Sequence, residues 1–442
     1  MTEPYPVMSH DTVIVDPQKC SLRIALVNTS DEGGGAERST YLLLQAFRQL
    51  GHSARLYVGV KRGTDPDVVE IPRVRPFPGI LRLVKWLEDR YGWQYLYQPW
   101  FRRLDQLMGD VDVVHYHNLW YGRQGYADLT ALPRLTKKYP SILTLRDWWM
   151  LTGHCAHPAL GCERWKNGCG KCPDLGLAPA IPKDGTQFNF GRKMQSVAGS
   201  RLRVIAVSDA VAADVKLSPI FRGRPVHTVH NGIDETAFFP RDQQQVRIQL
   251  GLPPDAFIVL IAGQSVEGTA GLEKGAGEYA IEALHSSAVQ PYLLAVGKSS
   301  ARSLAMYGAA GSAVPFQTDP QLLAAYYCAA DVVVVASLWE SFGRVAAEAQ
   351  MCGVPVATFA TGGLAEIVLH QQTGLVVERL NSQALGEAIR RLYADPQLRR
   401  QYGRCAAEQA LARFSNHAIA EQYLAHYRDE IALRRSAAGV KH

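Results

Sequence analysis

Two glutamates, Glu340 and Glu348, lie eight residues apart on either side of Gly343. A glycine there can open a helix, which would place Glu340 in the preceding loop and Glu348 about two turns along. Carboxylates accept hydrogen bonds from sugar hydroxyls, and the backbone N–H groups at a helix start suit a diphosphate. Here those N–H groups belong to Phe342, Gly343, Arg344 and Val345. The alternative interpretation is a helix-capping acid followed by a solvated acid.

A glycine-rich turn follows the first apolar run of the chain, at Gly33, Gly34 and Gly35. Glycines at a helix start let a phosphate approach bare backbone N–H groups. The turn is not the dinucleotide-binding fingerprint, because Arg38 stands where its third glycine belongs, and it lacks the Lys-Ser/Thr of a P-loop. A plain tight turn remains the alternative.

Four of the eight cysteines fall within eighteen residues, at Cys155, Cys162, Cys169 and Cys172. Thiolates are preferred zinc ligands, and a set that closes with C-x2-C predicts a tetrahedral, structural zinc site. His157 is a candidate to replace one thiol as a ligand. Paired disulfides and free thiols are the alternatives, and a cytosolic location counts against disulfides.

The elements that must position these residues alternate between strand and helix signals. Apolar runs predict strands at 22–27, 54–60, 111–115, 142–145, 204–207, 257–262, 292–296, 331–336 and 354–358. Helical signals follow at 36–50, 276–286, 343–352 and 383–394. Near-continuous apolar strands separated by helices predict an α/β fold with parallel sheets covered on both faces. Ligands of such sheets bind at the carboxyl ends of the strands.

The Asn231-Gly232 turn places an interdomain linker near 231–241, which predicts two doubly wound, Rossmann-like domains facing a cleft. We expect a flexible segment at 1–20 and a first domain at 21–231 that includes a cysteine-rich insert at 148–176. The second domain is expected at 232–415. A C-terminal helix within 416–442 is expected to cross back to the first domain.

Composition bounds the class of protein. A chain of 442 residues with 47% hydrophobic and 20% charged residues is long enough for two or three domains with real cores, which excludes wholesale disorder. No apolar run approaches the ~18 residues that span a bilayer, and the first residues lack the order of a secretory signal. A cytoplasmic location is therefore expected.

The positive charge is concentrated in the first half of the chain. Residues 1–230 hold 30 Lys and Arg against 21 Asp and Glu, whereas residues 231–442 hold 17 against 20. A basic half suggests an anionic partner, either a membrane surface or a phosphate-bearing substrate, although a mixed solvated surface is the alternative. No dense basic stripe indicates nucleic acid. Segment 81–104 interleaves aromatic and basic residues and suits a membrane interface, or else a helical excursion packed on its own domain.

The segment around Glu340 and Glu348 closely resembles the E-x7-E signature of retaining glycosyltransferases of family 4, which have the GT-B fold. Further motifs follow the family's order: Asn231-Gly232-Ile233-Asp234, Glu273-Lys274-Gly275, Ala329-Ala330-Asp331-Val332, Thr361-Gly362-Gly363 and Thr373-Gly374-Leu375. The resemblance covers about 20–435, nearly the whole chain. The cysteine block is similar to those of bacterial exopolysaccharide transferases of the colanic-acid type.

The resemblance implies a role for each matching residue. Glu340 would contact the donor sugar, Glu348 the nucleotide ribose, and Lys274 the diphosphate, while His117 would face the donor sugar and the acceptor. Gly34, Gly35 and Gly263 join the donor-binding set, although Gln264 follows Gly263 where relatives often carry an arginine. Arg146 and Asp147 stand on the acceptor side, where many members read His-Asp. For His117, a core histidine is the alternative.

The expected reaction is retaining transfer of a hexosyl group from a UDP-, GDP- or ADP-linked sugar to a hydroxyl of a glycan or lipid-linked acceptor. No catalytic metal is required, since a fixed ammonium and helix-end N–H groups can stabilise the leaving diphosphate. Asp110 and Asp112 fit a metal motif but begin a strand, so we interpret them as structural. A phosphorylase-like enzyme carrying pyridoxal phosphate and a sugar-nucleotide-binding scaffold without turnover are the alternatives. The reaction is placed in exopolysaccharide or cell-surface glycan synthesis, at the inner face of the plasma membrane.

Overall fold

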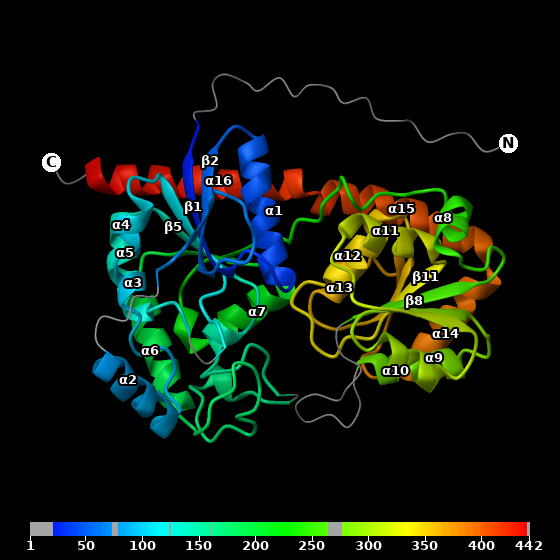
Figure 1. Ribbon diagram of the computed structural model, residues 1–442, viewed down its shortest axis with the longest axis horizontal. Coiled ribbons are helices and arrows are strands. Elements are labelled where there is room, and N and C mark those ends of the chain that lie inside the picture. The colour runs from blue at the N-terminus through cyan, green and yellow to red at the C-terminus, as the bar shows by residue number, and fades with distance from the viewer. Residues whose placement is uncertain (1–20, 73–77, 123–124, 160, 264–275, 440–442) are drawn as a thin grey trace.

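Two lobes lie side by side in the computed structural model, which describes residues 21–72, 78–122, 125–159, 161–263 and 276–439 (Figure 1). Each lobe is built on one parallel sheet with helices on both faces. The predicted α/β fold of two doubly wound domains is therefore confirmed. The expectation for 1–20 lies outside the described residues.

The first lobe holds a seven-stranded sheet in the order β3-β2-β1-β4-β5-β6-β7. Its strands are β1 Arg23–Ser30, β2 Ser53–Val60, β3 Val68–Glu70, β4 Val113–Tyr116, β5 Ser141–Leu145, β6 Arg203–Ala206 and β7 Val226–Thr228. Its helices are α1 Gly35–Gln49, α2 Pro78–Tyr91, α3 Pro99–Arg102, α4 Leu104–Met108, α5 Leu132–Lys138, α6 Thr186–Gly199 and α7 Asp209–Leu217. Ser208 caps α7 as its sequence position predicts, because its hydroxyl accepts the N–H of Val211 at 3.1 Å.

The second lobe holds a six-stranded sheet in the order β10-β9-β8-β11-β12-β13. Its strands are β8 Ile258–Ala262, β9 Tyr292–Val296, β10 Gly311–Val314, β11 Val332–Val335, β12 Val356–Phe359 and β13 Gly374–Val377. Its helices are α8 Gln243–Leu250, α9 Ala276–Ser286, α10 Ser300–Tyr307, α11 Pro320–Ala329, α12 Arg344–Met351, α13 Leu364–Ile367, α14 Ser382–Ala394 and α15 Pro396–Phe414.

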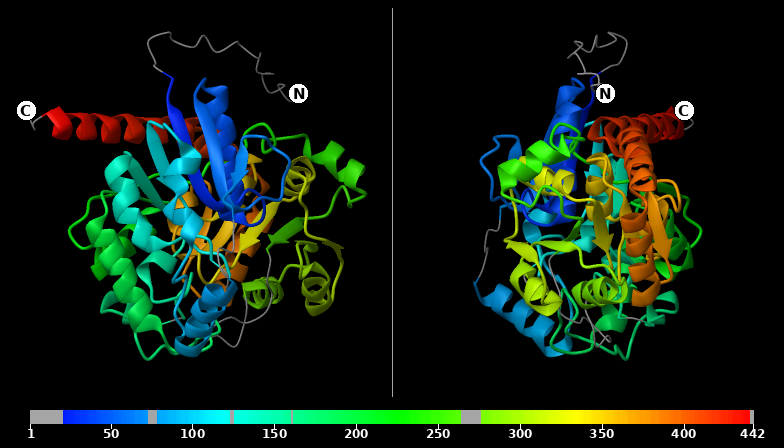
Figure 2. Two further views of the ribbon diagram at one scale, coloured as in Figure 1. Left: turned by 60° about the vertical axis from the view of Figure 1, so that its left-hand side comes forward. Right: turned by 90° about the vertical axis from the view of Figure 1, so that its right-hand side faces the viewer.

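The chain crosses between the lobes twice, and the two crossings pair with each other. Ile233 donates its N–H to Phe414 O at 2.8 Å, and Asn416 donates its N–H to Ile233 O at 3.0 Å. Helix α16 (Asn416–Gly439) then runs along the first lobe, as both figures of the whole chain show (Figures 1 and 2). Tyr423 and Tyr427 of α16 are fully buried in the core that also holds Phe47 of α1.

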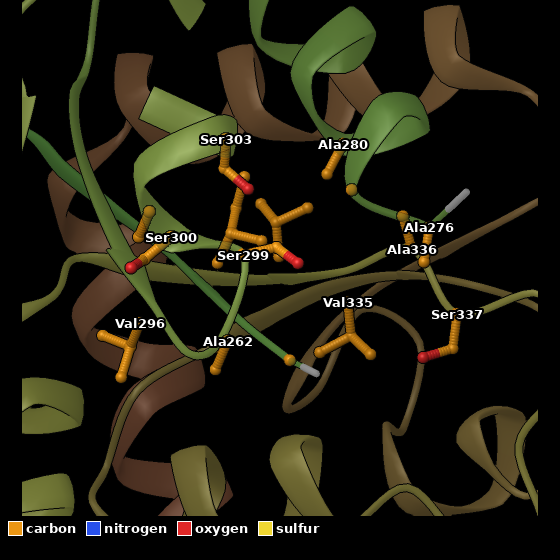
Figure 3. A pocket seen from close by; sticks show the side chains of 15 residues that line it. Ala262, Ala276, Ala280, Val296, Ser299, Ser300, Ser303, Val335, Ala336 and Ser337 are labelled. Carbon is orange, nitrogen blue, oxygen red and sulfur yellow. The ribbon is translucent and has the colours of Figure 1, made fainter. Parts of the chain in front are cut away.

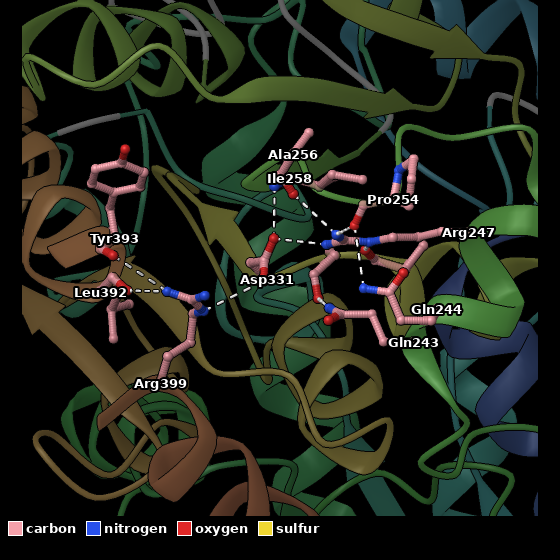
Figure 4. A network of polar contacts seen from close by, with 12 residues as sticks. Gln243, Gln244, Arg247, Pro254, Ala256, Ile258, Asp331, Leu392, Tyr393 and Arg399 are labelled. Carbon is pink, nitrogen blue, oxygen red and sulfur yellow. Dashed lines mark hydrogen bonds and ion pairs between the residues drawn. The ribbon is translucent and has the colours of Figure 1, made fainter. Parts of the chain in front are cut away.

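A buried ion network anchors two helices to the sheet of the second lobe (Figure 4). The Asp331 carboxylate, at the start of β11, accepts hydrogen bonds from Arg247 Nη2 at 2.7 Å and from Ile258 N at 2.8 Å. Arg399 Nε of α15 lies 3.4 Å from its other oxygen. The motif Ala-Ala-Asp before Glu340 therefore holds α8 and α15 in place, because an unpaired buried charge is costly.

Segment 81–104 divides into two environments. Helix α2 exposes Ile80, Leu83 and Trp86 on one stripe, each more than half exposed to solvent. In contrast, Trp93 stacks between Tyr91 and Phe188, with ring centroids 4.7 and 4.4 Å away. Helix α2 thus still suits a membrane interface, whereas Trp93 packs on its own lobe. No helix among the described residues is long and apolar enough to cross a membrane.

Candidate active site

A cavity of about 160 Å³ lies between the lobes and takes its walls from both. The first lobe contributes the glycine-rich turn and Arg38, and the second lobe contributes strand ends and helices α11 and α12. The lining residues are Gly33, Gly34, Gly35, Arg38, Ala262, Gly263, Val296, Gly297, Phe316, Gln317, Leu323, Tyr327, Arg344, Val345 and Glu348. Because parallel strands end at the same edge of each sheet, the two sheets direct their loops toward this cavity.

The glycine-rich turn opens helix α1 directly at the cavity. Gly34 is the N-cap of this fifteen-residue helix, and Gly33 has a φ of +146°, a conformation that favours glycine. The helix start carries a partial positive charge that suits an anion. Glu37 already accepts the Gly34 N–H, and burial raises the pKa of its carboxyl. A ligand at this turn must therefore share the helix start with an acid of the first turn.

Helix α12 begins at the opposite wall and carries Arg344 and Glu348. Gly343 has a φ of +110°, and an added Cβ would lie 2.8 Å from Leu364 Cδ2, so glycine is required where the loop enters the helix. Arg344 Nε pairs with Glu348 Oε1 at 2.8 Å, and Arg344 Nη1 donates to Ser39 Oγ of α1 at 3.1 Å. Arg344 thus connects the two lobes beside the cavity.

Glu348 is almost fully buried, with 3% of its surface exposed, and its second oxygen accepts the Tyr327 hydroxyl at 3.2 Å. It is therefore not the solvated acid of the alternative interpretation. Arg38 lies close enough to Arg344 and Glu348 for their charges to affect it, and burial lowers its pKa. Two arginines and one carboxylate thus give the cavity a net positive character, which suits a diphosphate.

Glu340 occupies the loop before α12, where Ser337 and the backbone N–H groups of Phe342 and Gly343 hydrogen-bond its carboxylate and oppose the pKa rise that burial causes. The backbone of this loop packs on the Thr361-Gly362-Gly363 turn, and Gly363 N donates to Glu340 O at 3.1 Å. A Cβ on Gly362 would lie 1.8 Å from that same oxygen, so only glycine fits. Glu340 is therefore held within the loop that leads into α12, whose N-cap is Gly343.

His117 and Arg146 meet at the carboxyl ends of neighbouring strands β4 and β5. Arg146 Nε and Nη2 lie 3.4 and 3.3 Å from His117 Nδ1, and Arg146 also donates to the linker residue Asn231. Since Nδ1 faces a donor, the proton of the neutral ring belongs on Nε2. His117 Nε2 is buried and has no hydrogen-bond partner among the described residues. Burial and the Arg146 charge hold the pKa of His117 well below its usual range.

The other residues named from the sequence either make structural contacts of their own or lie outside the described residues. Asp147 accepts Trp120 Nε1 and Trp149 N, both at 2.8 Å, so its carboxylate orders the loop after β5. Phe342 has a buried side chain that packs between His230 and Phe414, which leaves only its backbone for a ligand. Asp110 and Asp112 both pair with Arg23, in agreement with their structural interpretation. Lys274 lies outside the described residues.

A second cavity, of about 190 Å³, lies within the second lobe at the ends of β8, β9 and β11 (Figure 3). Its walls are small and mostly apolar side chains with the hydroxyls of Ser299, Ser300, Ser303 and Ser337. Gly263 lines this cavity and the interdomain one, so the two adjoin at the end of β8. The end of β8 therefore borders both spaces, as expected for a ligand site at strand ends.

The four clustered cysteines line one small cavity together with His154. His157, the histidine named from the sequence as a replacement ligand, instead packs on the Trp148 ring with centroids 5.5 Å apart. Among the described residues, no group of three or more His, Cys, Asp or Glu side chains is arranged to hold a metal ion. A preformed zinc site is thus not present in this arrangement.

Sequence reasoning did not assign Arg38, Ser39, Tyr327 or Glu366 to the site. Arg38 was visible only as the residue that breaks a glycine fingerprint. Glu366 of α13 accepts the N–H groups of Asp209 and Ala210, each at 2.9 Å, at the start of α7 in the other lobe. Such contacts between lobes leave no local sequence signal.

The site is an interlobe cavity with basic walls, flanked by a buried histidine that keeps a free N–H. Two Rossmann-like lobes with a ligand cavity between them make up the GT-B fold. Residues 33–237 match the sequence profile described as Glycosyltransferase Family 4, and residues 268–409 match the profile described as Glycosyl transferases group 1.

Curated relatives agree with these profiles. D-inositol 3-phosphate glycosyltransferase 1 of Catenulispora acidiphila is 31% identical over 356 residues, which cover 73% of this chain and 73% of that protein. D-inositol 3-phosphate glycosyltransferase 2 of the same organism is 34% identical over 421 residues and covers 89% of each chain. The chain belongs to the family 4 glycosyltransferases.

Solved structures share the fold. Sucrose-phosphate synthase from Thermosynechococcus elongatus has a TM-score of 0.64 at 22% identity, covering 93% of this chain and 100% of that one. HepE from Anabaena, solved in complex with UDP, has a TM-score of 0.62 at 19% identity, covering 92% and 100%.

Proposed function

We propose that this glycosyltransferase moves a hexosyl group from a nucleotide-diphosphate sugar to a hydroxyl of a glycan or lipid-linked acceptor, with retention of anomeric configuration. The observation that carries the proposal is the interlobe cavity, in which the start of α1 and Arg38 face Arg344 and Glu348. Each lobe supplies part of a site for one anionic, hydroxyl-bearing ligand. Because HepE was solved in complex with UDP, UDP-sugars are the first donors to test.

The donor would span the cavity from base to sugar. The nucleotide base would lie near Phe316 and Gln317, and Glu348 would accept the ribose hydroxyls. Arg38 and Arg344 would hold the diphosphate, together with Lys274 from the Glu273-Lys274-Gly275 motif. As the glycosidic bond breaks, the leaving diphosphate gains negative charge, and fixed cations stabilise that charge without a catalytic metal.

The sugar would lie between Glu340 and His117. The free N–H of His117 Nε2 can donate a hydrogen bond to a sugar hydroxyl, and the Arg146 contact at Nδ1 keeps the proton on Nε2. Glu340 would accept a sugar hydroxyl after turning from the N–H groups of Phe342 and Gly343. We propose that the acceptor attacks the face from which the leaving group departs and that a donor phosphate oxygen takes its proton. The protein then contributes positioning and charge stabilisation.

The acceptor is proposed to be a growing glycan, in exopolysaccharide or cell-surface glycan synthesis as in the transferases that share the cysteine block. The names of the curated relatives supply a competing acceptor, D-inositol 3-phosphate. The fully buried Arg146 is consistent with either, since it can orient His117 or reach an acceptor anion.

The exposed stripe of α2 supports a reaction at an anionic membrane face. Ile80, Leu83 and Trp86 are 51%, 57% and 56% exposed, and Arg82, Lys85 and Arg90 lie on the same helix. Helix α2 lies at the end of the first lobe opposite α16 (Figure 1). Apolar and basic side chains on one exposed helix suit reversible docking on a lipid surface.

A panel of nucleotide sugars tests the proposal in two stages. A preferred donor should raise the melting temperature in proportion to RT ln(1 + [L]/Kd), with the other nucleotide sugars ranking below it. The preferred donor is then incubated with a lipid-linked oligosaccharide or with D-inositol 3-phosphate, and release of the nucleoside diphosphate is measured. Release that depends on the lipid-linked oligosaccharide supports the proposal. Release that depends only on D-inositol 3-phosphate would make this compound the acceptor instead. Binding without any release would support the scaffold alternative.

A further inference from the structure

We propose that Cys155, Cys162, Cys169 and Cys172 bind a structural zinc ion that holds the loop between β5 and α6 against the loop before α12. All four thiols line one cavity of about 20 Å³, with Trp165 and Pro173 closing its walls. A space of that size accommodates about one water-sized atom. The proposal concerns this loop alone and does not depend on the proposed reaction.

The loop between β5 and α6 is long and has almost no regular secondary structure among its described residues. Residues 146–185 contain only two short 3-10 turns among their described positions, Trp149–Leu151 and Arg164–Lys166. Loops longer than about 12–15 residues without helix or strand are uncommon in compact domains. Where such a segment stays ordered, a disulfide or metal commonly supplies the missing stability. None of the four cysteines is in a disulfide in this structure.

The turn Cys169–Cys172 has an unusual backbone conformation, and the sulfur atoms at its two ends contact polar groups. Cys169 and Lys171 both have a φ of +50°, which non-glycine residues rarely adopt. The backbone N–H of Gly153 donates to Cys169 Sγ at 3.1 Å, and His154 Nε2 lies 3.3 Å from Cys172 Sγ. Two of the four sulfur atoms thus already contact the Gly153-His154 turn, and zinc would bind them as thiolates once their protons are released.

Lys193 of α6 holds the base of the same loop. It is 2% exposed, and its amine donates to the carbonyl oxygens of Trp149 and Thr152. Thr152 also lines the cysteine cavity. The base of the loop is thus fixed to α6 next to the four thiols, independently of any metal.

Zinc binding requires the thiols to turn inward, since they do not converge on one point in this structure. The bound loop would then fix Trp148, whose N–H donates to Ala156 O at 2.8 Å. The Trp148 ring contacts Trp339, the residue before Glu340, with centroids 5.9 Å apart. The zinc would therefore fix the contact between this loop and the loop before α12.

Elemental analysis of the full-length protein, purified without chelator, tests the inference. We expect about one zinc per chain, and Cys169→Ser should lose it. Cys405→Ser, on α15 in the other lobe, is the matched control and should keep it. Cobalt exchanged into the wild-type protein should show thiolate charge-transfer absorption. Removal of the metal should make residues 153–185 sensitive to protease.

If Cys169→Ser fails to fold, measurements on the wild-type protein test the proposal. Purified wild-type chain without zinc, whose four clustered cysteines alkylate as free thiols, would overturn the proposal. So would peptide mapping that finds these cysteines in two disulfides. A cobalt spectrum without thiolate absorption would likewise contradict it.

Discussion

At the scale of single residues, the two glutamates of the E-x7-E signature are not equivalent. Glu348 lies in the cavity wall, paired with Arg344 and Tyr327, whereas Glu340 lies in the loop before α12 and accepts N–H groups of that loop. Their spacing predicts that both flank a helix start, and the structure agrees on that point. Which carboxylate faces a ligand depends on Tyr327 and Arg344, and the motif does not specify those contacts.

Substitution of Glu340 or Lys274 should lower the turnover rate more than it lowers nucleotide affinity. Glu340→Ala and Lys274→Ala should each lower turnover by roughly 10²–10³-fold, the range observed when one charge-stabilising contact is lost. Glu348→Ala should mainly weaken nucleotide binding, measured by calorimetry. The exposed pair partner Glu387→Ala serves as the control. Near-native turnover in a folded Glu340→Ala or Lys274→Ala protein would remove that residue from the site. Unchanged binding with lost turnover in Glu348→Ala would reverse the roles of the glutamates.

His117 should make folding stability depend on pH. Burial holds its pKa well below the usual value near 6.5, so the unfolded chain binds more protons than the folded one as pH falls through 6.5. This contribution to stability is complete above that pH and declines below it. His117→Gln should reduce the slope of the unfolding free energy by about 1.4 kcal/mol per pH unit in that window. Urea titrations from pH 7.5 to 5 measure the slope, and equal slopes in both proteins would contradict the assignment.

At the scale of elements, apolar patterning predicts every internal strand of both sheets and none of the edge strands. The four that pattern misses are β3, β7, β10 and β13, each three or four residues long. An internal strand is buried on both faces and reads as a continuous apolar run. An edge strand is short and partly polar, so its sequence resembles a loop. The internal strands β4 and β5 end directly before His117 and Arg146, as the apolar pattern predicts.

Helix α2 should determine membrane binding. Ile80, Leu83 and Trp86 are each more than half exposed, so Leu83→Gln/Trp86→Gln should fold and lose co-sedimentation with anionic liposomes. Ile248→Gln changes an apolar residue of α8 that is 73% exposed and should bind as wild type. Binding of the wild type should weaken with salt, since about 0.1 M salt screens charges beyond ~10 Å. Equal, negligible sedimentation with and without anionic lipid would show that α2 is an ordinary surface helix.

At the scale of the whole molecule, the two lobes are held in register by contacts that no local pattern reveals. The crossings at Ile233 and Asn416 pair with each other, and Arg344 reaches Ser39 across the cavity. Glu366 adds a third contact, because its carboxylate caps α7 of the other lobe. The sequence predicts the two domains and the linker, but the closed arrangement depends on residues more than 150 positions apart.

Loss of Glu366 should open the cleft. Hydrogen bonds to a charged group contribute about 1.5–3 kcal/mol, so Glu366→Ala should weaken closure by roughly tenfold or more. Small-angle scattering should show a larger radius of gyration, and UDP affinity should fall while the lobes stay folded. Glu408→Ala, at an exposed position of α15, is the control. Identical scattering curves and UDP affinities in the Glu366→Ala and wild-type proteins would show that this contact does not govern closure.

The most direct test of the central claim follows the sugar itself. The protein is incubated with its preferred α-linked nucleotide sugar in water, and proton NMR records the first sugar released before its anomers equilibrate. Attack on the face that the leaving group departs from predicts α-sugar together with one nucleoside diphosphate, and both should diminish in Glu340→Ala. First-formed β-sugar would contradict retention. No release of nucleoside diphosphate from any donor of the panel, with or without acceptor, would contradict the claim that the interlobe cavity catalyses glycosyl transfer.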